Sequence, residues 1–250
     1  MLVSLPNSFG DAATNMAIDA SLLETIPAGH AVIRHYGWTE PSVTFGYSQN
    51  YAEVAAEFGL TDSGSLDRTP APLMLCRRLS GGGIVDHRDD WTYALILHAS
   101  LAAARLPATE LYAKTHTSLC RALEICGQAA QLAPCPSVST CGRTEARSRP
   151  VQNCFNSPTA NDVLCEDGRK IAGAAMKRRR GALLLQGSID RGRLPRDFNW
   201  REFQSRFTSQ IAQSLVLTPS EKDDVRPFFD GGLIQRERAR FSSSAWNRRR

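Results

Sequence analysis

The sequence predicts an α+β fold in which helices flank a mixed, mostly antiparallel sheet. The first observation is the order of the patterns: a helix, several strands, a second helix and then strands again, where repeated βαβ units would alternate the two. The second is Asp167-Gly168, a turn pair that strand twist favours between antiparallel strands. We find no internal repeat. We therefore expect a single domain over residues 1–250, with a core at about 8–190 and a C-terminal helical extension at 191–250.

Each element rests on its own pattern. Residues 11–26 predict a helix, because apolar side chains recur at helical spacing and Asp11 or Thr14 can cap its start. Alternation predicts strands, and clusters of Gly, Ser and Pro predict loops. In chain order these are strands at 31–36 and 43–45 joined by a turn at 38–41, a loop at 61–72, a strand ending near Arg77, a glycine loop at 80–83 and a strand at 91–98. After them come a helix at 110–126, a loop at 134–153, strands at 162–166, 170–176 and 182–189, and helices from about 200 with interruptions at Pro219 and Gly231-Gly232.

Length and composition exclude several classes of protein. The 250 residues contain no apolar run near the roughly 20 residues needed to span a bilayer, and the N-terminus lacks the pattern of a secretory signal. We therefore expect a cytoplasmic protein with no membrane partner. The seven cysteines are an odd number without CxxC spacing, which argues against a disulfide framework and against a structural metal site.

The net charge of +5 is concentrated in two places. Such runs favour acidic partners, although a solvated surface explains them equally well. Nucleic acid is not expected as a partner, because the basic runs carry no interleaved aromatic residues. The two places are the run Lys177-Arg178-Arg179-Arg180 and a tail with Arg236, Arg238, Arg240, Arg248, Arg249 and Arg250.

The first candidate motif is the glycine loop, Ser80-Gly81-Gly82-Gly83, which follows Arg77-Arg78 and precedes His87. Three successive glycines remove every Cβ, so a ligand can touch the backbone. Exposed N–H groups beside two arginines would suit a carboxylate, a phosphate or a thioester carbonyl. The loop is neither a Walker loop nor a dinucleotide fingerprint. The alternative is an ordinary glycine-rich hairpin turn.

The second motif places Lys170 directly after the Asp167-Gly168 turn, within Gly168-Arg169-Lys170-Ile171-Ala172-Gly173. A lysine held in this way can polarise an acyl carbonyl or exchange protons with a nucleophile. The alternative is an exposed hairpin lysine, which is the commoner case.

The third motif is Cys154, in a Pro-terminated segment, Asn153-Cys154-Phe155-Asn156-Ser157-Pro158, just before that hairpin. A nearby cation would favour the thiolate, the form that attacks a thioester and holds the acyl group covalently. The alternative is a buried cysteine that acts as a small apolar residue.

Together with the segments NMAID and RHYGW…PSVTFGYSQ, these motifs resemble the lipoate–protein ligase and octanoyltransferase family over roughly residues 8–190. The resemblance is carried by RRLSGGGIVDH, DDWTY, CFNSP…NDV and GRKIAGAAMKRRRGALLLQGSI in that order. Asp86 departs from the pattern, since related proteins tend to carry an aromatic or apolar residue there.

The resemblance implies a catalytic domain like those of biotin protein ligases and class II synthetases. It implies that Cys154 and Lys170 are catalytic and that the glycine loop lines an acyl-binding tunnel with Lys170. The residues expected to bind the acyl substrate are Arg77, Ser80, Gly81, Gly82, Gly83, His87 and Gly173.

Two enzymatic readings stay open. A cysteine-dependent octanoyltransferase takes octanoate from acyl carrier protein without a cofactor and passes it through a Cys154 thioester to a lysine of a lipoyl domain or of the glycine cleavage H protein. A lipoate–protein ligase instead uses ATP and magnesium to form lipoyl-AMP. Cys154 favours the transferase. A non-enzymatic module that binds acyl-carrier or lipoyl domains is the third possibility, and a role in biotin transfer has no residue in its favour.

Overall fold

The structure is a computed structural model that describes residues 1–60, 73–134, 158–220 and 224–249. Its largest element is a sheet with the strand order β1-β3-β7-β11-β10-β9-β8, in which β2 also pairs with β3. Within this sheet, β1 and β2 run parallel to β3, and all the other strand pairs are antiparallel. The predicted α+β class with a mostly antiparallel sheet is therefore confirmed. The strands are β1 (Leu2–Ser4), β2 (Ser8–Gly10), β3 (Ala31–Trp38), β7 (Asp90–His98), β8 (Gln131–Leu132), β9 (Val163–Leu164), β10 (Lys170–Arg178) and β11 (Ala182–Asp190).

A second, three-stranded sheet has the order β5-β4-β6. Its strands are β4 (Ser42–Phe45), β5 (Met74–Arg77) and β6 (Ile84–Asp86). The glycine loop connects β5 to β6, and these two strands pair on opposite sides of β4 and not with each other. The loop is therefore a crossing between two edges of a small sheet, and the alternative of a simple hairpin turn is wrong.

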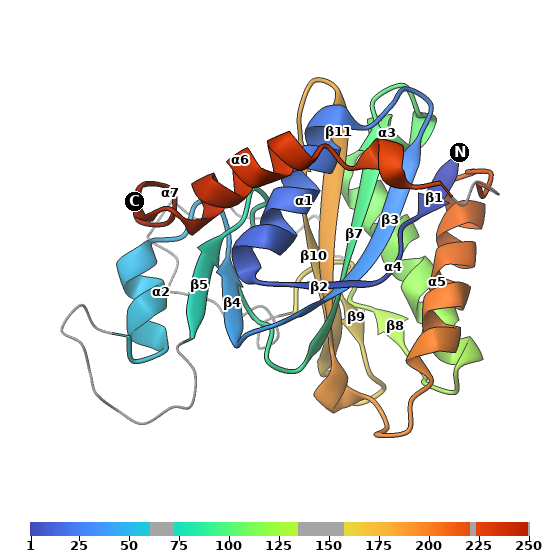
Figure 1. Ribbon diagram of the computed structural model, residues 1–250. Coiled ribbons are helices and arrows are strands. Elements are labelled where there is room, and N and C mark those ends of the chain that lie inside the picture. The colour runs from blue at the N-terminus through green and yellow to red at the C-terminus, as the bar shows by residue number, and fades with distance from the viewer. Residues whose placement is uncertain (61–72, 135–157, 221–223, 250) are drawn as a thin grey trace.

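Helices cover both faces of the large sheet (Figure 1). On one face, α4 and α5 contribute side chains such as Leu119 and Phe207 to a core that includes Leu95 and Leu185. On the other, α1 and α6 contribute Met16 and Phe241 to a core that includes Ile96 and Leu184, the alternate residues of the same strands. The helices are α1 (Ala12–Thr25), α2 (Tyr51–Glu57), α3 (Ala102–Arg105), α4 (Ala108–Ile125), α5 (Trp200–Ser214), α6 (Gly231–Ser242) and α7 (Ser244–Asn247).

Several predicted elements are confirmed, and others need correction. The first helix begins after Asp11, whose carboxylate accepts the N–H of Thr14 as an N-cap. In contrast, α2 and β6 were not predicted, and β3 extends two residues beyond the predicted strand to Trp38, the first residue of the expected turn, because β2 pairs with it there. The expected interruption at Gly231-Gly232 is the start of α6, since Asp230 caps the N–H of Leu233. The loop predicted at 61–72 and nearly all of that predicted at 134–153 lie outside the described residues.

Within the described ranges, none of the helices is long and apolar enough to cross a membrane.

Candidate functional site

The glycine loop turns its carbonyl groups toward the protein. The carbonyl of Ser80 accepts the N–H of Tyr47, and that of Gly83 accepts the N–H of Gly46. The guanidinium of Arg78 donates to the carbonyls of Gly81 and Gly83 at 2.9 and 3.0 Å. The N–H groups of the three glycines have no acceptor among the residues that the structure describes. The loop therefore offers a row of backbone donors, without side chains, to an oxygen of a ligand.

The shape of this loop depends on Gly46, which follows β4. A Cβ on Gly46 would lie 2.0 Å from the carbonyl oxygen of Gly82, closer than any real contact allows. Gly82 itself has a φ of +86°, in the left-handed region that favours glycine. Gly46 and Gly82 therefore let the two backbone segments touch, and Gly46 was not among the predicted site residues.

Arg77, at the end of the strand that leads into the glycine loop, is bonded to the surrounding backbone. Its side chain is fully buried and donates to four backbone carbonyls, those of Tyr47, Gln49, Trp246 and Asn247. These contacts fix the end of β5 against β4 and the C-terminal helix α7. These contacts give Arg77 a positioning role, and the ligand contact that the sequence predicted for it stays a prediction.

Ser80 and His87 likewise belong to buried polar networks. The hydroxyl of Ser80 donates to Gln186 at 2.6 Å, and the amide of Gln186 donates to Asp19, which forms an ion pair with Arg34 at 2.7 Å. The His87 ring lies between Thr44 and Asp90, 2.7 Å from each, and stacks on Trp38. Both side chains are less than one tenth exposed. They hold the two ends of the glycine loop in place relative to the sheet.

Lys170 is buried and ion-paired. Its ammonium lies 2.8 Å from a carboxylate oxygen of Asp162, and each side chain is about one twentieth exposed. The alternative of an exposed hairpin lysine is therefore wrong. The carboxylate also accepts the N–H and the hydroxyl of Thr159, at 2.7 and 2.9 Å. The intervening turn places Asn161 at a φ of +67°, a conformation that asparagine tolerates better than most residues.

The Lys170 side chain lies over Gly173, where a Cβ would be 2.6 Å from its Cε and Nζ atoms. Two residues further along β10, the Cβ of Ala175 lies 3.5 Å from the position that a Cβ on Gly82 would take. Alternate residues of a strand share a face, and i and i+2 are about 7 Å apart. Lys170 and the glycine loop therefore lie over neighbouring positions on one face of β10. The acyl-binding tunnel that the family resemblance implies stays a prediction.

Cys154 and most of its motif, residues 153–157, lie outside the described residues. The four cysteines that the structure describes are all free thiols. Burial raises the pKa of Cys76 and Cys120 to about 12, and it also raises the pKa of Cys126 and Cys165. None of these four is activated as a nucleophile at neutral pH.

Asp162 is the residue that sequence reasoning missed. It was placed in a strand and given no role, although the same hairpin carries Lys170. The available signal was an acidic residue at the start of the opposite arm, where antiparallel pairing brings it back toward the lysine. Among the described ranges, no group of three or more ligating side chains could hold a metal ion. The groups suited to an anionic or carbonyl oxygen are the N–H groups of the glycine loop and the ammonium of Lys170.

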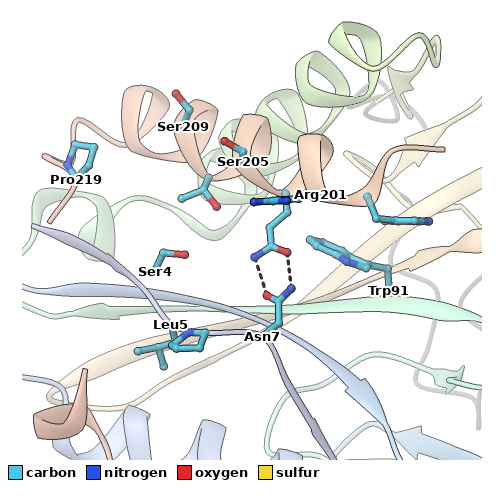
Figure 2. A pocket seen from close by; sticks show the side chains of 12 residues that line it. Ser4, Leu5, Asn7, Trp91, Arg201, Ser205, Ser209 and Pro219 are labelled. Atoms are coloured by element: carbon cyan, nitrogen blue, oxygen red, sulfur yellow. Dashed lines mark hydrogen bonds between the residues drawn. The ribbon is translucent and has the colours of Figure 1, made fainter. Parts of the chain in front are cut away.

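A separate hollow of about 870 Å³ lies between the segment Ser4–Asn7 and α5 (Figure 2). Asn7 and Gln204 exchange two hydrogen bonds across it, at 2.9 and 2.7 Å, and its lining includes Trp91 and Trp200, whose rings stack on each other. None of the predicted site residues that the structure describes lines this hollow, so we do not take it as the candidate site.

Comparisons with known proteins agree with this geometry. The model of the lipoyl protein ligase A/B catalytic domain matches residues 11–191. The octanoyltransferase LipM of Oceanobacillus iheyensis is 30% identical over 187 residues, which are 74% of this chain and 62% of that protein. The octanoyltransferase LipM of Geobacillus kaustophilus is 32% identical over 179 residues, 71% of this chain and 60% of that protein. The matched part thus spans about three fifths of the length of these relatives.

Solved structures share the fold. A bipartite lipoate protein ligase of Thermoplasma acidophilum, studied with its E2 lipoyl domain, superimposes with a TM-score of 0.68 at 18% identity, over 98% of this chain and 95% of that one. A lipoate-protein ligase A bound with ATP gives a TM-score of 0.67 at 19% identity, over 98% and 97% of the two chains.

Proposed function

Because the chain belongs to the lipoyl protein ligase A/B catalytic-domain family, we propose that it transfers an octanoyl or lipoyl group to a lysine of a lipoyl domain or a glycine cleavage H protein. The observation that carries this proposal is that a buried, ion-paired lysine and a loop whose three glycine N–H groups have no acceptor among the described residues lie over one face of β10. Such donors stabilise the negative charge that develops on a carbonyl oxygen during acyl transfer.

We favour octanoyl–acyl carrier protein as the donor and Cys154 as the nucleophile, with no cofactor. Three observations support this. The relatives of highest identity that we report are octanoyltransferases, and none of the described thiols is activated. Thr159, five residues after Cys154, donates to the carboxylate that pairs with Lys170.

The proposed reaction has two steps. The Cys154 thiolate attacks the thioester carbonyl, a new C–S bond forms, and the carrier thiolate leaves and takes up a proton. The loop N–H groups donate hydrogen bonds to the negative oxygen, and the Lys170 ammonium stabilises the thiolate and the transition state. The neutral amine of the acceptor lysine then attacks the Cys154 thioester, a C–N bond forms, the amine nitrogen releases one proton to solvent to give the amide, and the Cys154 thiolate leaves. The amide is more stable than the thioester, which drives the transfer forward.

An ATP-dependent lipoate–protein ligase is the second candidate. The same N–H groups and Lys170 would suit the phosphate of an acyl-adenylate, and one structure of the same fold is a ligase bound with ATP. In that reaction ATP and magnesium would supply activation of free lipoate, and Cys154 would have no covalent role.

Acceptor modification under two conditions separates these candidates. A lipoyl domain is incubated with the protein and either octanoyl–acyl carrier protein without ATP, or lipoate with ATP and Mg²⁺, and its mass is measured. We expect modification in the first mixture. Modification only in the second supports the ligase, and binding of the lipoyl domain without modification in either supports the non-enzymatic module.

A further inference from the structure

The face of β10 that carries the site continues beyond the glycine loop to a group of cations. Gly173, Ala175 and Lys177 are alternate residues of one strand and share a face. The Lys170 side chain lies over Gly173, and the glycine loop lies over Ala175. The ammonium of Lys177 lies 5.0 Å from the centre of the Tyr47 ring. The backbone N–H of Tyr47 donates to the carbonyl of Ser80, so the residue that carries this ring lies directly beside the loop.

The C-terminal segment brings a second cation to the same ring. The guanidinium of Arg249 lies 3.9 Å from the centre of Tyr47 and 4.2 Å from that of Trp246. Neither Lys177 nor Arg249 has a carboxylate within ion-pair distance among the residues that the structure describes. Two positive charges thus share one tyrosine ring at the end of the site, and cation–π contacts hold them without neutralising them.

Further positive charge surrounds this pair. Burial lowers the pKa of Arg240, and the nearby Glu237 carboxylate raises it. The positive charges of Arg179 and Arg249 lower this pKa further, which shows that they lie near Arg240. Arg240 and Arg179 are each paired with a glutamate, at 2.6 and 3.6 Å. Lys177 and Arg249 therefore remain as the described cations here that can receive an external anion.

The distance identifies the kind of anion. Lys177 lies four positions after Gly173, which puts their Cα atoms about 13 Å apart along an extended strand. An acyl-adenylate carries its phosphate directly on the acyl carbonyl, so with the carbonyl at Lys170 its phosphate cannot reach Lys177. A thioester on a phosphopantetheine arm carries its phosphate at the far end of a long flexible spacer. An arm that follows the face of β10 past the glycine loop would place this phosphate at the cation pair.

We propose that Lys177 and Arg249, held on Tyr47, form a subsite for the phosphate of the donor's phosphopantetheine arm. This inference rests on the proposed use of a carrier-bound thioester. It gives the segment that follows α7 a role in donor recognition, because Arg249 lies in that segment while Lys177 lies on β10.

Two small donors that differ only in the phosphate test the subsite. Octanoyl-4′-phosphopantetheine and octanoyl-pantetheine are titrated by calorimetry into Cys154→Ser protein, in which acyl transfer to this thiol is blocked. We expect the phosphate to tighten binding about tenfold or more, as a charge-assisted contact should. Arg249→Gln and Lys177→Gln should each remove most of this preference and leave the affinity for octanoyl-pantetheine unchanged.

Arg206→Gln is the matched control, because it removes an equal charge from an exposed pair with Glu202 on α5 and should keep the preference. Equal binding of the two donors, or a preference that survives in both subsite variants, would overturn the proposal. If only intact acyl carrier protein is affected by the variants, the cations dock an acidic protein surface and not the phosphate. Acceptor modification by wild-type protein without any phosphate preference would refute the subsite alone, and a phosphate preference without acceptor modification would refute the proposed function alone.

Discussion

Gly173 leaves open the space that the Lys170 side chain occupies: a Cβ there would lie 2.6 Å from both Cε and Nζ of the lysine. The lysine that the proposed chemistry requires is therefore positioned by the absence of a side chain three residues later, as well as by the carboxylate of Asp162.

Replacing Gly173 should accordingly impair catalysis through Lys170. We expect Gly173→Ala to lower kcat/KM for octanoyl transfer by about 100-fold, the order of effect of moving a catalytic group by about 1 Å. The protein should still fold, because the lysine side chain can move. Gly181→Ala is the control, since a Cβ there meets nothing within 4 Å. Equal rates for the two variants, measured by acceptor mass, would show that the position of Lys170 does not matter.

Removal of the Asp162 charge should destabilise the protein. Asp162→Asn leaves the Lys170 ammonium buried without a compensating charge, and breaking a buried pair in this way costs about 3–5 kcal/mol. Denaturant unfolding measures the change. Asp167→Asn, which removes one partner of an exposed pair with Arg169 in the same hairpin, should have little effect. A small change for Asp162→Asn would mean that the lysine is not held by this carboxylate.

Two glycines of the loop region should respond differently to alanine. Gly46→Ala places a Cβ against the Gly82 carbonyl, so we expect lower thermal stability together with loss of activity. Gly81→Ala meets no neighbouring atom and should leave the melting temperature unchanged. Its methyl group would nevertheless occupy the space above the loop N–H groups and raise KM for the donor. An unchanged KM for Gly81→Ala would indicate that the donor does not approach this loop.

His35 should make stability depend on pH. Burial, with a smaller contribution from Arg34, lowers the pKa of His35 to about 3, and neither ring nitrogen has a partner among the described residues. In the unfolded chain the His35 ring is protonated as the pH falls through 6.5, whereas in the folded protein it is protonated only near pH 3. The contribution of His35 to the unfolding free energy is therefore fully present above pH 6.5. Between pH 6.5 and about 3 the unfolding free energy should fall by about 1.4 kcal/mol per pH unit.

The variant His35→Phe keeps the stacking on Trp91 and removes the titration. Its unfolding free energy should equal or exceed that of wild type at pH 7 and should fall less steeply on acidification. Parallel pH profiles for the two proteins would contradict the assignment to His35.

Local signals account for the parts of the fold that the sequence predicted. Asp11 caps α1, and Gly168 adopts the positive φ of +79° that the hairpin turn requires. The missed strand β6 has three residues, and its pairing depends on β4, about forty residues earlier, so no periodicity could reveal it. In contrast, α2 had a readable signal, because Asn50 caps it.

The site divides in the same way. Lys170 and the glycine loop could be predicted because their motifs are contiguous. The ion pair with Asp162, the contact of Gly46 with Gly82 and the burial of Arg77 beneath α7 all require the tertiary structure. They join residues that are distant in sequence or lie on opposite arms of a hairpin, and nothing in the local pattern of either partner specifies the other.

The most direct test of the covalent mechanism is the intact mass of the protein after incubation with octanoyl–acyl carrier protein in the absence of ATP. Wild type, Cys154→Ser and Cys165→Ser are compared, since Cys165 is a buried thiol of the same region whose pKa is raised. We predict one octanoyl adduct, released by excess thiol, on wild type and Cys165→Ser and none on Cys154→Ser. An adduct that persists on Cys154→Ser, or no adduct at all together with acceptor modification that requires lipoate and ATP, would contradict the proposed mechanism.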